Sequence, residues 1–251
     1  MRKCNLKKDL EQYLKDLHLP TVRKSYEDLG LKAGDEGLSY PEYLLELMRN
    51  ECEERKRKRT ERWLRESQLP LEKTLQAFEM KRMPGKVAQQ AKVLLDGSFL
   101  ERKENVLAFG NPGSGKTHLL CAVGQELVYQ GHRMYYSCCE LLLQELLRAK
   151  KELRLDRVLK KLKKYDGIIL DDIGYVQHDQ EEMEVLFSLL AQRYERGSVM
   201  ITSNLPFSKW EKIFKDPMTT AAAIDRLVHH CVILELNVPS YRMAEAKKRK
   251  Q

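Results

Sequence analysis

From residue 105 onward, short apolar runs alternate with longer amphipathic stretches. The runs cover residues 106–109, 134–137, 167–170, 199–202 and 232–236, and the stretches between them cover residues 116–129, 140–150, 156–164, 181–196 and 219–229. Runs this short and this apolar predict strands buried on both faces, and the stretches between them have helical length and periodicity. The pattern therefore predicts an α/β fold in which a parallel five-stranded sheet lies between helices.

Residues 6–67 show a different pattern, without a convincing strand. Apolar residues recur there at three- and four-residue spacing, as one face of a helix requires, at Leu6, Leu10, Tyr13, Leu14 and Leu17. Pro20 ends this helix, the glycines of residues 30–37 predict a loop, and Ser39 caps a long helix that continues through residues 51–65. We therefore expect a small all-α N-terminal domain at residues 1–67 and an α/β domain at residues 68–251, joined through residues 70–97.

The residues after the first predicted strand match the phosphate-loop pattern G-x-x-x-x-G-K-[ST]. They read Gly110-Asn111-Pro112-Gly113-Ser114-Gly115-Lys116-Thr117, and these residues, with His118 in the helix that follows, are expected to bind the nucleotide. The glycines let backbone N–H groups converge on phosphate oxygens, and the N-terminus of the helix faces them as well. Lys116 is expected to reach the β- and γ-phosphates, and Thr117 to offer its hydroxyl to Mg²⁺. This strand–loop–helix context predicts a site for ATP and Mg²⁺; the alternative is a glycine-rich surface loop.

Polar residues follow two other predicted strands. Asp171 and Asp172 end the third run, where we expect Asp171 in the Mg²⁺ shell and Asp172 beside the attacking water. The alternative is that both carboxylates cap the turn at Gly174. Asn204 follows the fourth run and is predicted to contact the γ-phosphate or orient the water. Arg226 lies on a predicted short helix, where it is either an arginine finger for a neighbouring subunit or a surface ion-pair partner.

The chain has 45 Lys and Arg residues against 37 Asp and Glu residues, which gives a formal net charge of +8. Such an excess favours a polyanionic partner, since phosphates neutralised by Lys and Arg release their counterions. The densest basic run covers residues 55–65, where Trp63 is available for stacking, and it predicts a helix face that contacts DNA. Two alternatives are a nuclear-localisation signal and a solvated face whose cations pair with acids one turn away, as Arg55 would with Glu51.

Three further features concern the compartment. None of the six cysteines forms a C-x-x-C pair, which favours packing roles and a reducing cytoplasm. Residues 1–9 have no apolar stretch behind their charges, so no signal peptide is expected. No run approaches the roughly 18 apolar residues of a membrane span. We therefore expect a cytoplasmic protein without a membrane partner.

The order of these motifs resembles the AAA+ superfamily, and longer segments resemble the IstB-like helper ATPases of insertion-sequence transposition. Those segments are residues 110–119, 170–175, 192–196, 202–207, 210, 223–229 and 240–242, and the likeness covers roughly residues 38–242. The resemblance implies an ATP-dependent, DNA-binding homo-oligomer that prepares target DNA and stimulates a partner transposase. It also implies that Arg226 acts in a neighbouring subunit's site and that Arg242 is a second nucleotide sensor. Val238 and Pro239 depart from the family, which usually has a glycine just before Ser-Tyr-Arg.

Two other functions are compatible with a phosphate loop. The related DnaC-type helicase loader shares the ATPase core, but Trp210, residues 193–195 and the basic helix before Pro70 resemble the transposition helper more closely. A monomeric P-loop kinase would need neither Arg226 in a neighbour nor a basic N-terminal domain. The chain shows no base-reading motif, so we expect it to bind double-stranded DNA with little sequence preference.

Overall fold

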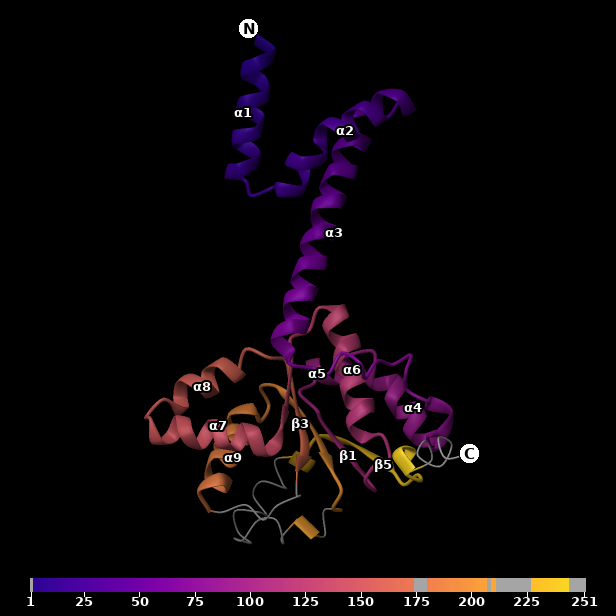
Figure 1. Cartoon of the computed structure of the whole chain (residues 1–251), viewed down its shortest axis with the longest axis vertical. Coiled ribbons are helices and arrows are strands. Elements are labelled where there is room, and N and C mark those ends of the chain that lie inside the picture. Colours follow the sequence, from indigo (N-terminus) through magenta and orange to yellow (C-terminus); the bar gives the residue numbers. More distant parts are fainter. Residues whose placement is uncertain (1, 174–179, 207–208, 211–226, 244–251) are drawn as a thin grey trace. The chain divides into compact units, whose positions relative to one another are not determined.

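The computed structural model describes residues 2–173, 180–206, 209–210 and 227–243 (Figure 1). The chain separates into two compact units, Met1–Arg62 and Trp63–Gln251. The first is helical and the second contains the sheet, as the sequence predicts; the division between residues 67 and 68 stays a prediction. None of the described helices is both long enough and apolar enough to cross a membrane.

The helical unit is built from α1 (Arg2–Asp16), α2 (Pro20–Glu36) and the first part of α3 (Tyr40–Ser67). Its small core consists of Leu14, Val22 and Leu47, one from each helix. The predicted loop at residues 30–37 is wrong, because α2 continues through it and ends at Gly37, whose φ is 67°. Each glycine inside a helix costs only about 1 kcal/mol, and Ala33, which lies between Gly30 and Gly34, is buried.

The second unit contains a five-stranded, wholly parallel sheet. Its strands are β1 (Asn105–Gly110), β2 (Met134–Cys138), β3 (Gly167–Ile173), β4 (Ser198–Ser203) and β5 (Cys231–Leu236), in the order β2-β3-β4-β1-β5. All five predicted strands are confirmed, with ends shifted by up to three residues. Because the strands are parallel, the carboxyl ends of β2, β3, β4 and β1 meet at one edge of the sheet.

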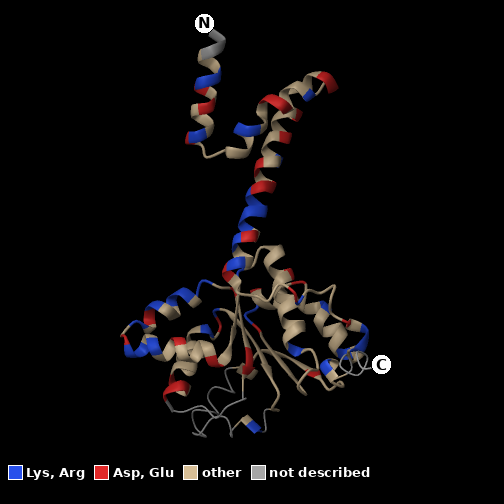
Figure 2. Ribbon diagram, viewed as in Figure 1, with Lys and Arg blue, Asp and Glu red and all other residues tan. Residues whose placement is uncertain are grey.

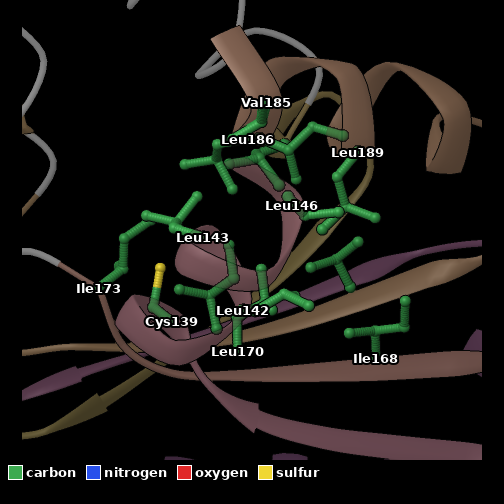
Figure 3. Packing of buried hydrophobic residues seen from close by; sticks show 14 of the residues in the cluster. Cys139, Leu142, Leu143, Leu146, Ile168, Leu170, Ile173, Val185, Leu186 and Leu189 are labelled. Carbon is green, nitrogen blue, oxygen red and sulfur yellow. The ribbon is translucent and has the colours of Figure 1, made fainter. Parts of the chain in front are cut away.

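Helices cover both faces of this sheet (Figure 1). One face carries α7 (Cys139–Lys151), α8 (Leu155–Leu162) and α9 (Gln180–Arg193), whose apolar side chains pack against β3 and its neighbours (Figure 3). The other face carries α4 (Gly85–Leu94), α5 (Ser98–Glu101) and α6 (Lys116–Gln130). Strand β1 supplies Leu107 and Phe109 to the first core and Val106 and Ala108 to the second, the alternation that a doubly covered strand requires.

The segment that joins the two predicted domains is more ordered than its sequence suggests. It contains the short 3-10 helix η1 (Met80–Arg82) and α4, and α5 follows directly after it; the sequence analysis predicts none of the three. Four predicted helices of the α/β region are confirmed as α6, α7, α8 and α9. Most of the fifth, residues 219–229, lies outside the described residues.

Candidate nucleotide site

The loop between β1 and α6 has the conformation that a phosphate cradle needs. Gly113 and Gly115 adopt φ angles of 77° and 96°, which favour glycine over any other residue. A side chain at Gly113 would collide with Ser240, and a Cβ at Gly115 would lie 3.1 Å from Phe78. Gly115 also stands at the N-terminus of α6, so free backbone N–H groups and the positive end of the helix point into the loop.

Lys116 lies at the mouth of this loop with 6% of its surface exposed. Its ammonium donates hydrogen bonds to the carbonyls of Gly110, at 2.9 Å, and Asn111, at 3.0 Å. A third bond, of 2.7 Å, goes to Oδ1 of Asn204 at the end of β4. Burial lowers the pKa of Lys116, and the nearby carboxylates of Asp172 and Asp171 oppose that shift. The lysine is therefore fixed by two carbonyls of the loop itself and by Asn204, which lies 88 positions further along the chain.

Asp171 accepts hydrogen bonds from three hydroxyl groups. Thr117 donates to Oδ1 at 2.7 Å and Thr202 to the same oxygen at 2.6 Å, while Tyr136 donates to Oδ2 at 3.0 Å. Burial raises the pKa of Tyr136, so its phenol stays a donor. The structure thus brings together Thr117 and Asp171, the two residues that the sequence predicts as Mg²⁺ ligands.

Asp172 lies beside this pair in a strained backbone conformation, with a φ of 66°. Its N–H donates to the hydroxyl of Thr202 at 2.7 Å, and its Oδ1 accepts a 3.0 Å bond from the amide of Asn204. Burial and the adjacent charge of Asp171 raise the pKa of Asp172. Oδ2 accepts no hydrogen bond from any described residue, which leaves one carboxylate oxygen for a further ligand.

Two residues of this network, Tyr136 and Thr202, are not predicted from the sequence. Both lie on strands that flank β3: Thr202 near the carboxyl end of β4 and Tyr136 in the middle of β2. Their signal is present in the sequence as a hydroxyl residue near the end of an apolar run, but it becomes informative only once the strand order is known.

A cavity of about 280 Å³ opens beside the loop. Apolar and aromatic residues form part of its wall, namely Phe78, Met83, Val238, Pro239 and Tyr241. Tyr241 donates its backbone N–H to the carbonyl of Gly113 at 2.9 Å, so this wall is tied to the loop itself. The cavity has flat apolar and aromatic walls next to a phosphate cradle, as the base of a nucleotide requires.

The remaining predicted residues lie around this cavity or outside the described chain. His118 lines the cavity, where its ring packs against that of Phe78 with centroids 5.2 Å apart and planes inclined at 59°, and it bonds the carbonyl of Thr74. Its contact with the nucleotide stays a prediction. Arg242 lines the cavity, and its role as a sensor stays a prediction. Arg226 lies outside the described residues.

The site fits a magnesium nucleotide by three observations. The hydroxyl of Ser114 is buried inside the loop and has no hydrogen-bond partner among the described residues. The positive φ angles of Gly113 and Gly115 let the backbone of the loop curl so that its N–H groups can converge on an anion. Oxygen donors from Thr117 and Asp171 meet next to it, and oxygen is the ligand type that Mg²⁺ takes.

Comparison with known proteins agrees with this geometry. The family model described as "IstB-like ATP binding protein" matches residues 12–250. A putative insertion sequence ATP-binding protein of Sinorhizobium fredii is 42% identical over 95% of this chain and 80% of its own length. The putative ATP-binding protein of insertion sequence IS21 from Pseudomonas aeruginosa is 37% identical over 96% of this chain and 91% of its own.

Solved structures show the same fold at lower identity. The DnaC helicase loader aligns with a TM-score of 0.51 and 19% identity, over 60% of this chain and 88% of that one. DnaA from Aquifex aeolicus, bound to AMPPCP, aligns with a TM-score of 0.55 and 21% identity, over 73% of this chain and 55% of that one. These likenesses support the AAA+ P-loop fold, and the sequence relatives carry the family assignment. The chain belongs to the family of IstB-like ATP-binding proteins of insertion sequences.

Proposed function

We propose that this chain hydrolyses ATP at the described site and uses the nucleotide cycle to assist an insertion-sequence transposase on DNA. The observation that supports hydrolysis most is the position of Asn204, which bridges Lys116 on the phosphate side and Asp172 on the acidic side. A site that only stored nucleotide would not need a carboxylate held at that place. The family descriptions speak of ATP binding, so the hydrolytic step is our proposal.

Each residue of the site has a distinct proposed task. Lys116 and the loop N–H groups hold the β- and γ-phosphates, and Thr117 and Asp171 hold Mg²⁺. Bound Mg²⁺ supplies charge neutralisation on the phosphate oxygens. Asp172 accepts a hydrogen bond from the attacking water through Oδ2, while Asn204 fixes the opposite oxygen of the same carboxylate.

Variants of Lys116 and Asp171 test this mechanism. Lys116→Ala is expected to abolish nucleotide binding, because it removes the cation of the cradle, and Asp171→Ala to abolish Mg²⁺-dependent hydrolysis. Binding is measured with a fluorescent ATP analogue and hydrolysis by phosphate release. Near-normal turnover in both variants would overturn the assignment of the site.

We also propose that the active form is a homo-oligomer in which Arg226 enters the site of a neighbouring subunit. This rests on the family resemblance of residues 223–229. Mixing Lys116→Ala with Arg226→Ala subunits tests it. Where the intact phosphate loop of an Arg226→Ala subunit meets the intact Arg226 of a Lys116→Ala subunit, one functional site is regenerated. Activity restored in the mixture supports action between subunits; a mixture no more active than its components contradicts it. A chain that stays monomeric with ATP and DNA would favour the kinase alternative.

DNA and a transposase are the proposed partners, in the cytoplasm. The relatives are named as insertion-sequence proteins, which favours the transposition helper over the helicase loader. Stimulation of transposase activity by the purified chain with ATP and target duplex tests this directly. A chain that bound a replicative helicase and left the transposase unaffected would instead be a loader.

The basic run on α3 supports DNA contact less than its sequence suggests. Arg55 bonds Glu51 at 2.8 Å, and Arg57 lies 2.7 Å from Glu54 and 2.5 Å from Glu61. Three of its cations, counting Lys58 at 3.3 Å from Glu54, are thus paired within the helix. Pairing within one helix fits the alternative of a solvated face for these three cations, and contact of the whole run with DNA stays a prediction.

A further inference from the structure

Two consecutive acidic residues, Asp171 and Asp172, lie near the carboxyl end of β3. Apart from them, the five strands contain one charged residue, Glu235 of β5, so the strands are mostly tan in Figure 2. Consecutive residues of a regular strand point to opposite faces of the sheet. A site that uses both carboxylates therefore needs a backbone irregularity that turns them to the same side.

The pairing of β3 with β4 contains such an irregularity. The first four residues of β3 pair one to one with β4, and the pairing then resumes at Ile173. Between these points β3 has two residues, Asp171 and Asp172, and β4 has one, Thr202. Two residues opposite one define a β-bulge, in which the extra residue leaves the ladder and the strand bends.

The bulge changes the face on which the following side chains lie. Regular alternation would place Asp172 on the same face as Ile168 and Leu170, and Ile173 on the opposite face. Ile173 instead belongs to the same apolar core as Ile168 and Leu170, the core that α7 and α9 cover. The extra residue thus takes Asp172 out of a position in which its carboxylate would point into an apolar core.

The hydroxyl of Thr202 bonds both residues of the bulge. It donates to Oδ1 of Asp171 at 2.6 Å and accepts the backbone N–H of Asp172 at 2.7 Å. The second bond satisfies a buried backbone donor and holds Asp172 at its φ of 66°, which is unfavourable for a residue with a side chain. Only 1% of Thr202 is exposed, so water does not compete for either bond.

We propose that Thr202 is a positioning residue for hydrolysis: its hydroxyl maintains the bulge and thereby turns both carboxylates toward the phosphate loop. Asp171 then meets the hydroxyl of Thr117 at 2.7 Å, and Asp172 accepts the amide of Asn204 at 3.0 Å. Thr202 acts only through these two carboxylates. The inference rests on the proposed hydrolytic function and adds the residue that gives the acidic side of the site its shape.

Two substitutions of Thr202 separate its hydroxyl from its shape. Thr202→Val keeps the branched side chain, which suits a buried strand, and removes the hydroxyl. Thr202→Ser keeps the hydroxyl and removes the methyl group. The control is Ser198→Ala, which removes another buried hydroxyl from the opposite end of β4, where it bonds the carbonyl of Phe99 at 3.4 Å. All variants are compared in the full chain, per folded molecule.

The bulge itself is observed through the backbone amide of Asp172, whose hydrogen exchange is measured by NMR spectroscopy. Loss of the acceptor in Thr202→Val should speed exchange of this amide by about tenfold. The amide of Ile169, in the regular part of the same strand, should keep its wild-type rate. The Thr202→Ser variant should exchange as wild type does at both positions.

Two further measurements report on the two carboxylates separately. The Mg²⁺ concentration needed to promote binding of a non-hydrolysable ATP analogue reports on Asp171 and should rise about tenfold in Thr202→Val. The single-turnover rate at saturating Mg²⁺ reports on Asp172 and should fall by about 10²-fold. Affinity for ATP without Mg²⁺ should not change, because Lys116 bonds other groups. Thr202→Ser and Ser198→Ala should behave as wild type.

The outcomes separate this inference from the proposed function. A wild-type chain that binds ATP without hydrolysing it contradicts the proposed function, and the exchange and Mg²⁺ measurements still decide whether Thr202 shapes the site. If wild type hydrolyses ATP and Thr202→Val matches it in rate and Mg²⁺ dependence, the inference alone is overturned. A serine variant as impaired as the valine variant, or equal losses in Ser198→Ala, would also refute it, because the hydroxyl of Thr202 would then not be the cause.

Discussion

Lys116 and Asn204, 88 positions apart in the chain, are joined by a 2.7 Å hydrogen bond between the lysine ammonium and the amide oxygen. The amide nitrogen of Asn204 donates in turn to Asp172 at 3.0 Å. One neutral side chain therefore fixes the cation of the phosphate cradle and the carboxylate next to it. It does so without adding charge to a site that has to receive a polyanion.

Replacement of Asn204 by alanine is expected to separate nucleotide binding from hydrolysis. Lys116 keeps its bonds to the two loop carbonyls, so the affinity for ATP should stay within a few-fold of wild type. Hydrolysis in a single turnover should slow by about 10²-fold, because Asp172 loses the hydrogen bond from Asn204. The control is Ser203→Ala. Among the described residues its hydroxyl bonds the backbone of Ile173 and Leu205, so the variant should leave the rate per folded molecule unchanged. Equal rates in Asn204→Ala and wild type would contradict a role in turnover.

Tyr136→Phe is expected to weaken Mg²⁺ binding about tenfold, the scale found when a group that orients a metal ligand is removed. The phenol bonds Oδ2 of Asp171, and without it the carboxylate can rotate away from Thr117. The measurement is the Mg²⁺ dependence of hydrolysis, with ATP binding in the absence of Mg²⁺ as a second readout that should not change. Tyr135→Phe is the control, because that ring packs against Tyr165 in the core of the other sheet face. A shift of the same size in both variants would mean a general loss of packing.

The residues that the sequence identifies in this site share one property: each is a polar or glycine position next to an apolar run. The phosphate loop, Asp171 and Asn204 are all found in this way, because parallel strands end at a common edge and their last residues must meet there. Tyr136 and Thr202 are not found. Their contacts to Asp171 depend on β2 and β4 being the neighbours of β3. The local pattern of apolar residues does not predict the order of strands in a sheet.

The wrongly predicted loop at residues 30–37 and the unpredicted helices α4 and α5 have the same origin. Local composition favours a break at Gly30 and Gly34, yet tertiary packing decides, since Ala33 between them is buried in the helical unit. Similarly, the segment that contains Phe78 looks like a linker, but it forms a wall of the nucleotide cavity. Local secondary-structure propensity does not predict a segment that is ordered by its contacts with the rest of the domain.

Glu51 provides a stability prediction that depends on pH. Its carboxylate, with 3% of the side chain exposed, accepts the N–H groups of Thr21 and Val22 at the start of α2 and a bond from Arg55. Burial raises the pKa of Glu51, but the bonds from Arg55, Val22 and Thr21 outweigh it, so the pKa lies below its ordinary value of 4.5. A lowered carboxyl pKa contributes stability above about pH 4.5 that disappears as the pH falls through the folded-state pKa.

We therefore expect Glu51→Gln to destabilise the chain by about 1–2 kcal/mol at pH 7, because the hydrogen bonds lose their charged acceptor. The difference from wild type should shrink toward zero as the pH falls below about 4.5 and through the lowered pKa of the folded state, where the wild-type carboxyl takes up a proton. Thermal unfolding followed by circular dichroism at several pH values measures this. Glu53→Gln, at an exposed position of the same helix, should show no such dependence. A Glu51→Gln deficit that stayed constant with pH would exclude the charge as its cause.

Arg193 is a buried cation whose partners are backbone carbonyls. Its exposed fraction is 3%, and burial lowers the pKa of Arg193 to about 10, with the charge of Asp166 opposing the shift. The two terminal nitrogens of the guanidinium donate to four carbonyls, those of Leu162 at 3.3 Å, Tyr165 at 2.6 Å, Asp166 at 2.8 Å and Ser198 at 2.9 Å. The side chain thus ties the end of α8 to the starts of β3 and β4, at the edge of the sheet opposite the nucleotide site.

Arg193→Lys should consequently reduce the stability of the fold by about 3 kcal/mol while leaving the chemistry of the nucleotide site intact. A lysine has one nitrogen where arginine has a planar fork, so at least two of the four carbonyls would lose their donor, at a cost of about 1–3 kcal/mol each. Urea unfolding gives the stability difference, and nucleotide affinity measured well below the unfolding midpoint should equal that of wild type. Arg196→Lys, three positions further along at an exposed site, is the matched control and should unfold with the wild-type midpoint. If Arg193→Lys lost nucleotide affinity at full folding, the residue would act on the site across the sheet, and a purely structural role would be refuted.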